Sequence, residues 1–206
     1  NSAIALNCST LAYELVPLTL GDYTLIISNT NKQRGLADSK YNERRGECEE
    51  AVKCLSTIAP IKELCELDLK TFLERQNAIP DPTVRKRAKH AISENQRVKE
   101  AVKVLKSGDI VSFGKLMNES HESLRYDYEV TGLELDTMVE EARKIKGVLG
   151  SRMTGAGFGG CTVSLVHKNS VDEFRTEVGK HYTQKTKLNP DFYVAEIGNG
   201  AKALSI

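Results

Sequence analysis

The order of hydrophobic periodicities along the 206 residues constrains the fold more than any other feature. Near the start, apolar and β-branched residues form short runs that predict three strands, at 3–7, 11–16 and 24–28. The link at 8–10 is short enough for the first two strands to form a hairpin. After a long helical stretch, the chain closes on strand, helix and strand at 161–166, 171–183 and 192–197. This order indicates an α+β fold and not a doubly wound sheet.

Between residues 38 and 146, apolar residues recur at three- and four-residue steps, which predicts helices. The expected helices lie at 38–55, 67–76, 82–105, 110–126 and 133–146. The first has a candidate cap in Asp38-Ser39. The third begins at Pro80-Asp81-Pro82 and stops at Gly108.

The charges of the helical stretch are segregated. The helix at 82–105 and its last turn have eight Lys or Arg side chains at positions expected to be exposed, against three acids, whereas residues 119–141 contain eight acids and one arginine. A basic stripe alone would suggest nucleic-acid binding. Neighbouring helices of opposite charge explain both runs, and the net charge is only +1, so we expect no nucleic-acid partner.

Membrane insertion, secretion and metal binding have no support in the sequence. The longest apolar runs, such as Leu25-Ile26-Ile27, are far too short to span a bilayer, and we expect no signal peptide. The five cysteines form no CxxC pair, so no zinc site is expected. Reduced and mostly packed thiols in a cytosolic protein are the expectation, with Cys161 buried in a core strand.

Five of the fifteen glycines fall between Gly150 and Gly160. Glycine loses more backbone entropy on folding than any other residue, so this density needs a reason. Left-handed torsions or close approach of the main chain to another group would supply one. A flexible linker or a tight helix-to-strand turn is the purely structural alternative, although Met153 and Phe158 are unusual in a linker.

Gly155, Gly157 and Gly160 match the spacing G-x-G-x-x-G. A dinucleotide-binding fingerprint follows a strand and opens a helix, whereas this run is expected to follow a helix and open a strand. A P-loop is excluded because no Gly-Lys-Ser/Thr sequence follows. The remaining ligand-binding interpretation is a nest of backbone N–H groups that faces an anion, with Arg152 as the nearby cation.

The run 150–161 resembles the third conserved motif of the GHMP small-molecule kinases, in the form that galactokinases carry. Further stretches are similar to the same family, at 29–31, 37–45, 87–90, 119–130 and 200–204. The resemblance covers essentially the whole chain, which is identified as a member of this family.

The resemblance implies a fold and a division of the chain. The fold would be the GHMP kinase C-terminal domain, a mixed, mainly antiparallel sheet covered by several helices. Residues 1–20 would be strands left over from an N-terminal domain or interdomain sheet, and residues 21–206 would be the C-terminal domain. In the family, a Gly-Glu-His-Thr-Asp signature, the main phosphate loop and the aspartate base lie upstream of this region. We therefore expect no catalytic residue and no metal ligand in this chain.

The resemblance also suggests site residues. Tyr41 matches the tyrosine that lies against the sugar, where its phenol and ring can both make contacts. The glycine-rich run is expected to support the phosphate loop and the substrates through Ser151, Arg152, Met153, Thr154, Gly155, Ala156, Gly157, Phe158, Gly159 and Gly160. Asn31 and Arg34 are candidates for contact with the nucleotide, whereas Gln33 departs from the basic residue found in some relatives.

Other polar residues are expected to be structural. Arg152 would either orient anionic groups or form an internal salt bridge. His90 and His121 lie in helical patterns, and His90 can pair with Glu94 one turn on. Asp127 and Glu129 are not expected to act as the base.

The implied reaction is phosphoryl transfer from ATP, with Mg²⁺, to the anomeric hydroxyl of D-galactose. The alternatives are another GHMP sugar kinase, such as one that acts on N-acetylgalactosamine, and a non-catalytic galactokinase-like sugar sensor. The implied partners are D-galactose and ATP, with no nucleic acid and no membrane. We expect a cytoplasmic protein that is a monomer at full length, and a fragment that is inactive alone and self-associates through open strand edges.

Overall fold

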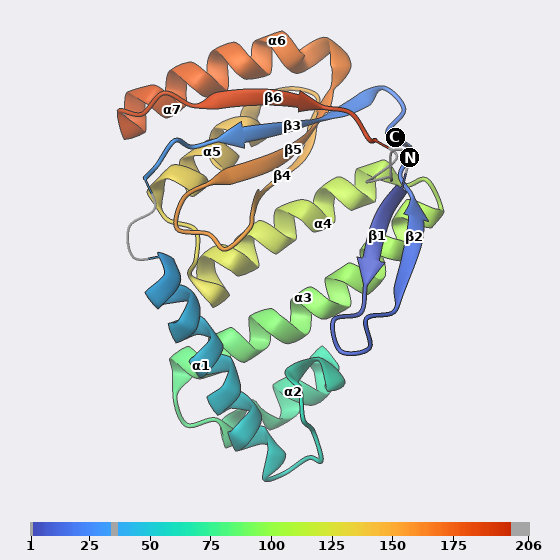
Figure 1. Ribbon diagram of the computed structural model, residues 1–206, viewed down its shortest axis with the longest axis vertical. Helices are drawn as coiled ribbons and strands as arrows, with labels where there is room; N and C mark the ends of the chain where they lie inside the picture. The colour runs from blue at the N-terminus through green and yellow to red at the C-terminus, as the bar shows by residue number, and fades with distance from the viewer. Residues whose placement is uncertain (1, 34–36, 199–206) are drawn as a thin grey trace, which may run out of the picture.

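The computed structural model describes residues 2–33 and 37–198. Figure 1 shows a two-stranded hairpin, a group of long helices, and a four-stranded sheet with helices along its outer side. The predicted α+β architecture is confirmed.

The hairpin pairs β1 (Ser2–Leu6) with β2 (Tyr13–Pro17) in an antiparallel sheet of its own. The side chain of Asn7 accepts hydrogen bonds from the amides of Ser9 and Thr10 at 3.0 and 3.1 Å, which shapes the turn. Val16 is buried, whereas most other hairpin side chains are exposed. Lys106, at the end of a long helix, pairs with Glu14 at 2.5 Å and ties the hairpin to the helices. The division of the chain at residue 20 stays a prediction.

The main sheet has the order β4-β5-β3-β6, and all of its pairings are antiparallel. Its strands are β3 (Tyr23–Asn29), β4 (Val148–Thr154), β5 (Cys161–His167) and β6 (Asp191–Ala195). One face packs against α5 (Leu133–Lys144) and the helix formed by α6 (Val171–Glu173), η5 (Phe174–Val178) and α7 (Gly179–Thr186). Ile26, Val166, Met138 and Phe174 form the centre of this core.

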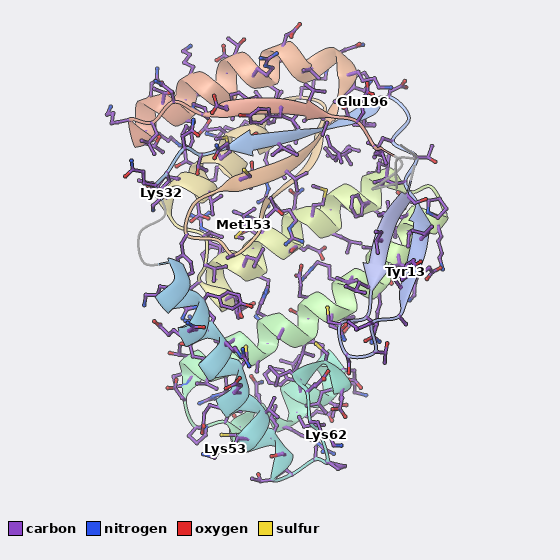
Figure 2. All side chains as sticks on the ribbon, viewed as in Figure 1. Tyr13, Lys32, Lys53, Lys62, Met153 and Glu196 are labelled. Carbon is purple, nitrogen blue, oxygen red and sulfur yellow. The ribbon has the colours of Figure 1, made fainter. Side chains whose placement is uncertain are left out.

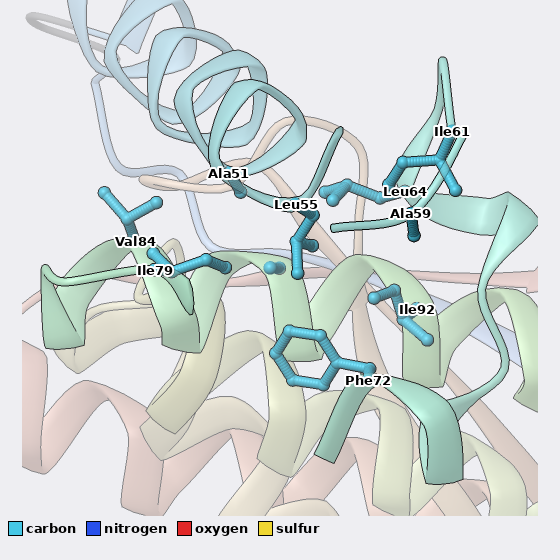
Figure 3. Packing of buried hydrophobic residues seen from close by; sticks show 10 residues of the cluster. Ala51, Leu55, Ala59, Ile61, Leu64, Phe72, Ile79, Val84 and Ile92 are labelled. Atoms are coloured by element: carbon cyan, nitrogen blue, oxygen red, sulfur yellow. The ribbon is translucent and has the colours of Figure 1, made fainter. Parts of the chain in front are cut away.

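The helical group comprises α1 (Ala37–Ser56), α2 (Leu69–Arg75), α3 (Pro82–Lys106) and α4 (Ile110–Ser123), with short turns η1 (Leu64–Glu66) and η2 (Gln76–Ala78) between α1 and α3. Leu55, Phe72 and Ile92 are fully buried in its own hydrophobic core (Figure 3). Asp81 caps α3 as predicted, because its side chain accepts from the amides of Thr83 and Val84. The core of the helical group is thus separate from the core of the sheet, and α3 and α4 join the two parts of the molecule.

The start of α1 differs slightly from the sequence prediction. The helix begins at Ala37, one residue before the expected cap. The end of α4 also differs, because the chain continues from Ser123 into a π-helical turn, η3 (Leu124–Tyr128). This turn stops at Glu129, whose φ of 56° is left-handed.

Strand β4 is the element that the sequence analysis missed. Residues 148–154 were expected to be part of a helix-to-strand loop, but they pair with β5 along their whole length apart from one register shift between Val148 and Gly150. Small and polar residues hide the strand, because Gly150 and Ser151 occupy buried positions that usually hold large apolar side chains. The Ser151 hydroxyl instead bonds to that of Ser164 at 2.8 Å inside the sheet.

The oppositely charged runs do face each other. Lys89 pairs with Asp127 at 3.0 Å, and Lys86 pairs with Glu129 at 3.4 Å. Arg87 was expected to be exposed but is buried, because it lies between α1 and η3 and bonds to both. Among the described residues, no helix is both long and apolar enough to cross a membrane.

The cysteines are less buried than expected. Cys48, Cys54 and Cys161 are half-buried, and Cys8 and Cys65 are exposed. All five are free thiols. Cys161 lies at the first position of β5, next to the glycine-rich turn, where the core does not fully cover it.

Candidate active site

The glycine turn, residues 155–160, joins β4 to β5 and explains the density of glycine. Gly155, Gly157, Gly159 and Gly160 have φ values of 82°, 86°, 129° and 82°. Side chains rarely adopt such torsions, so the turn depends on residues without a Cβ. The structure corrects the expected context, because the turn follows a strand and opens a strand, forming a hairpin.

The turn has an exposed tip and a buried base. Thr154, Gly155 and Ala156 are exposed, and a Cβ on Gly155 would meet no atom within 4 Å. Gly157 is buried, and a Cβ there would lie 2.1 Å from the carbonyl oxygen of Val130. The tip therefore presents main chain to an approaching molecule, whereas the base is fixed against the protein.

The β4 residues before the tip support the turn from the core. Met153 and Ser151 are buried, and their side chains point away from solvent. The imidazole of His121 accepts the Met153 amide hydrogen at 3.2 Å. The Asn118 side chain accepts from the Ser151 amide at 2.9 Å and anchors β4 to α4. A role of these two side chains at the substrates stays a prediction.

Arg152 forms the internal salt bridge that was one of its two expected roles. Its guanidinium lies 3.3 Å from a carboxylate oxygen of Glu94 and also donates to the Met153 carbonyl at 3.0 Å. Glu94 further pairs with Arg97 and accepts from Ser120 at 2.5 Å. Glu94 thus pairs with Arg97 and Arg152 and not with His90 as predicted. This cluster lines a cavity of about 330 Å³ between the sheet and helices α3 and α4.

The end of β3 holds the base of the glycine turn. The amide and hydroxyl of Thr30 both donate to the carbonyl oxygen of Gly160, at 2.9 and 2.7 Å. The stem of Lys32 lies along Gly159, and its ammonium pairs with Glu134 at 2.7 Å. In Figure 2, Lys32 lies on the side of the molecule where α1 begins, opposite Tyr13 of the hairpin.

Asn31 uses its side chain within the protein. Its amide donates to the carbonyl of Asn189 and to Asp191, both at 2.8 Å, and its φ is 52°. Asn31 lies between two residues that touch the glycine turn, but contact with a nucleotide stays a prediction. Arg34 lies outside the described residues, as do Gly35 and the stretch 200–204.

Phe158 anchors the turn to the segment 129–132. Its amide donates to the Val130 carbonyl at 2.8 Å. Its ring packs against a small core of Leu124, Val130, Leu135 and Met153. Phe158 adopts a left-handed φ of 57°, an unfavourable conformation for a bulky residue, so the anchoring contacts must hold it there.

Tyr41 lies on the first half of α1 and is 58% exposed. Arg44, one turn along the same helix, is buried and points into the protein. Its guanidinium donates to the carbonyl oxygens of Tyr128 at 2.7 Å and Glu129 at 3.2 Å. The helix that carries Tyr41 is thus fixed to the chain immediately before Val130.

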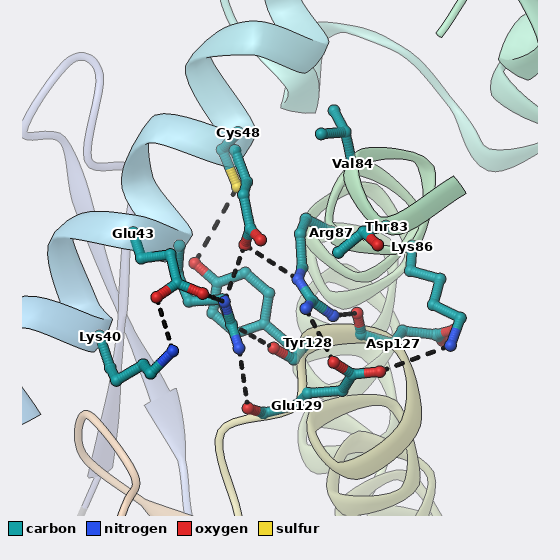
Figure 4. Close-up of polar contacts among 12 residues, drawn as sticks. Lys40, Glu43, Cys48, Thr83, Val84, Lys86, Arg87, Asp127, Tyr128 and Glu129 are labelled. Atoms are coloured by element: carbon teal, nitrogen blue, oxygen red, sulfur yellow. Dashed lines mark hydrogen bonds and ion pairs between the residues drawn. The ribbon is translucent and has the colours of Figure 1, made fainter. Parts of the chain in front are cut away.

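Arg87 reinforces this junction from α3. It donates to Glu47 of α1 at 3.0 Å, to the Asp127 carbonyl at 2.7 Å and to Glu129 at 2.8 Å (Figure 4). Burial opposes the charge of Arg87, but the hydrogen bonds to Glu129 and Glu47 raise its pKa above the ordinary value. The bond from Arg87 likewise lowers the pKa of the Glu129 carboxyl, so both groups stay charged.

His90 and His121, the two histidines considered in the sequence, both have partners within the protein, and that of His121 is the Met153 amide. His90 is buried, stacks on Tyr128 with ring centroids 4.4 Å apart and bonds to the Ser123 hydroxyl at 2.9 Å. Desolvation by burial lowers the pKa of His90 to about 4, so the imidazole is neutral at pH 7. Burial also raises the pKa of the Tyr128 phenol above its ordinary value.

Arg44, Arg87 and Lys32 are parts of the site that were not predicted from sequence. Arg44 and Arg87 look like ordinary members of charged helices, and their contacts with residues 127–129 distinguish them. One signal was available for Arg87, because it lies three residues after Val84 and next to Ala88, on the edge of the apolar stripe of α3.

Comparison with known proteins agrees with this geometry. Residues 99–184 match the family model "GHMP kinases C terminal". The galactokinase of Streptococcus suis is 55% identical over 205 residues, which are 100% of this chain and 53% of that protein. The galactokinase of Fusobacterium nucleatum is 58% identical over 202 residues, which are 98% of this chain and 52% of that protein. The chain thus spans about half the length of the curated relatives it matches.

Solved structures give the same result. Lactococcus lactis galactokinase complexed with galactose superimposes with a TM-score of 0.95 and 51% identity, over 98% of this chain and 52% of that one. L. major mevalonate kinase, at 16% identity and a TM-score of 0.52, shares the fold alone. Residues 99–184 therefore belong to the GHMP kinase C-terminal family, and nearly the whole chain is similar to galactokinases in sequence and backbone.

Proposed function

We propose that this chain is the C-terminal part of a galactokinase, which transfers a phosphoryl group from ATP to the anomeric hydroxyl of D-galactose. The observation that carries the proposal is the 0.95 TM-score, at 51% identity, with a galactokinase whose structure contains galactose. Similarity to curated galactokinases over the whole chain supports it.

The described residues could form one side of a galactokinase active site. Tyr41 offers a phenol and an exposed ring to a sugar. The tip of the glycine turn offers exposed main chain with little side-chain bulk to phosphate groups. Because phosphoryl transfer relies on positioning and charge stabilisation, we assign these residues to positioning and propose no catalytic base in this chain.

ATP and Mg²⁺ are proposed as the co-substrate and its metal. The left-handed backbone of the glycine turn fits close approach of an anion, which supports a place for the phosphates near residues 154–156. Within residues 2–33 and 37–198, no three His, Cys, Asp or Glu side chains gather to hold a metal ion. We propose that residues outside this chain hold Mg²⁺, together with the phosphates.

Two alternative functions belong to the same family. Substrate preference and turnover distinguish them from a galactokinase. An N-acetylgalactosamine kinase would phosphorylate the acetylated sugar in preference to galactose. A sugar sensor would bind galactose and ATP without releasing ADP. We favour the galactokinase because several curated galactokinases match nearly the whole chain at above 50% identity, and we propose a cytoplasmic monomer for the whole protein.

A chimera tests the proposal directly. This chain replaces the matching 202-residue region of the F. nucleatum galactokinase, and ADP release is measured with galactose, N-acetylgalactosamine or glucose as acceptor. The proposal expects ATP-dependent turnover with galactose as the best acceptor. A folded chimera that prefers N-acetylgalactosamine, or binds galactose without turnover, would overturn it.

The isolated chain is the matched control. It contains Tyr41 and the glycine turn but, under the proposal, no base, so we expect no galactose-dependent ADP release from it. Turnover by the isolated chain would show that the base lies within these residues.

A further inference from the structure

A continuous set of contacts links the helix of Tyr41 to the glycine turn. Arg44 donates to the Tyr128 carbonyl at 2.7 Å and to the Glu129 carbonyl at 3.2 Å. The next carbonyl along the chain, that of Val130, accepts the Phe158 amide at 2.8 Å. One short segment therefore bonds on one side to α1 and on the other side to the turn.

Beyond Tyr128, the last residue of η3, this segment leaves regular secondary structure. Glu129 has the left-handed torsions φ 56° and ψ 52°, and Gly132 has a φ of 92°. A non-glycine residue in this region is strained and needs support from its surroundings. Arg44 supplies support through two main-chain contacts, and Arg87 holds the Glu129 carboxylate.

The geometry points to Arg44 as a positioning residue, which fixes the distance between the sugar-facing Tyr41 and the phosphate-facing glycine turn through the segment 128–130. This inference rests on the proposed function for what those two features contact. Arg44 does not itself touch substrate in this assignment. It acts because its planar guanidinium reaches two successive carbonyls and, at 2.9 Å, Glu47 of its own helix.

Arginine is required for this arrangement, and lysine is a poor substitute. A lysine ammonium is a compact charge on a flexible stem and lacks the fixed fork of donors that spans two carbonyl oxygens. Arg45, the next residue, is the matched control because its side chain is 73% exposed and, within the part of the chain that the structure describes, pairs only with Glu49, one turn along the surface.

Hydrogen exchange on the full 206-residue chain tests the coupling without any assay of activity. We compare the wild type with Arg44→Gln, Arg44→Lys and Arg45→Gln under native conditions, and follow the Phe158 amide. Loss of the Arg44 bonds should raise its exchange rate by about tenfold or more through local opening, while central β5 amides stay protected. Arg45→Gln should leave the Phe158 amide unchanged.

The same three substitutions in the F. nucleatum chimera give the kinetic readout. A displaced Tyr41 and turn should raise the KM for galactose and lower kcat by roughly tenfold to a hundredfold, since catalysis by positioning is sensitive to small shifts. Arg44→Lys should recover only part of the loss. Where Arg44→Gln does not fold at 25 °C, Arg44→Lys carries the test in both experiments.

The two experiments separate the inference from the proposed function. Wild-type exchange at Phe158 in both Arg44 variants would overturn the inference, whatever the chimera does. An Arg44→Lys chimera with unchanged KM and kcat would also overturn it. A folded wild-type chimera that never phosphorylates galactose would defeat the proposed function, while altered Phe158 exchange would still establish the mechanical link.

Discussion

Gly114 of helix α4 and Gly150 of strand β4 meet main chain to main chain, and a Cβ on Gly150 would lie 2.2 Å from the Gly114 carbonyl oxygen. A Cβ on Gly114 would in turn lie 2.7 Å from main-chain atoms of Leu149. The helix can therefore lie directly beneath the strand that leads into the glycine turn. Neither contact can relax by rotating a side chain, because the opposing atoms are backbone.

Gly150→Ala should consequently destabilise the chain by about 3 kcal/mol, the upper range for an overpacked site. For a chain of this size, the melting temperature should fall by roughly 6–12 °C. Gly46→Ala is the control, because Gly46 is exposed in α1 and a Cβ there meets nothing within 4 Å. That change should stabilise the helix by about 1 kcal/mol. Equal melting temperatures for the two variants would contradict the close approach.

Substitution of two glycines of the same turn should have different effects: one should lower stability and the other should lower activity. Gly157→Ala places a Cβ 2.1 Å from the Val130 carbonyl, so we expect a loss of stability in urea unfolding of the chain. Gly155→Ala meets open space and suffers only the cost of a left-handed torsion, about 1 kcal/mol. In the chimera, however, Gly155→Ala should lower kcat by about tenfold or more, because its methyl group would occupy the proposed phosphate-facing tip. A fully active Gly155→Ala chimera would show that the tip of the turn does not face the phosphates.

Tyr41→Ala in the chimera should raise the KM for galactose more than the KM for ATP, because the proposed contact is with the sugar. Steady-state kinetics with each substrate varied in turn measures the difference. Tyr126→Ala is a matched control, since both tyrosines are 58% exposed and Tyr126 lies in η3, stacked on Arg125. An unchanged KM for galactose in the Tyr41 variant would exclude the contact.

His90 should make the chain sensitive to mild acid. Its pKa is about 4 in the folded state against 6.5 in the unfolded state, so the unfolded state binds the proton first as pH falls. Stability is therefore unaffected above pH 6.5 and decreases progressively between pH 6.5 and 4. From pH 7 to pH 5 the loss should be about 2 kcal/mol. Urea unfolding at both pH values checks this, and His90→Gln should lose correspondingly less; equal losses would show that other groups dominate.

The isolated chain should self-associate through the hairpin. Ile4 pairs with Leu15 and Leu6 pairs with Tyr13 across the two strands, so these four side chains share one face. They are 53–69% exposed, which leaves an apolar face uncovered. Sedimentation should show dimers or larger species, and Ile4→Lys with Leu15→Lys should restore a monomer. Val111→Lys, at an exposed position in α4, should not. A wild-type monomer at high concentration would refute the prediction.

Periodicity and caps were enough to predict most of the architecture from sequence. The helix α3 could be recognised because Val84, Ala88 and Ala91 recur at helical steps, and Asp81 and Gly108 mark its ends. Strand β4 could not be recognised, because two of its three buried positions are filled by Gly150 and Ser151. Gly150 leaves room for the backbone of α4, and the Ser151 hydroxyl has a buried hydrogen-bond partner in Ser164. A hydropathy pattern shows neither of these contacts.

The candidate site shows a similar limit. Composition identified the glycine turn, and resemblance to a family pointed to Tyr41. Arg44 was not identified because the contacts that tie it to the segment 128–130 are with carbonyl oxygens, which every residue type offers and which no sequence pattern marks. An internal salt bridge of Arg152 was one of two predictions from sequence, but only the fold identifies Glu94 as the partner.

Phe158 makes the glycine turn a rigid part of the sheet. Glycine-rich connections are often the hinges of enzymes, but this one has a partly buried aromatic ring packed against a small core and its base bonded on both sides, at Val130 and Gly160. Swinging the turn outward would require extracting that ring. The turn should therefore keep its position when another molecule approaches its exposed tip.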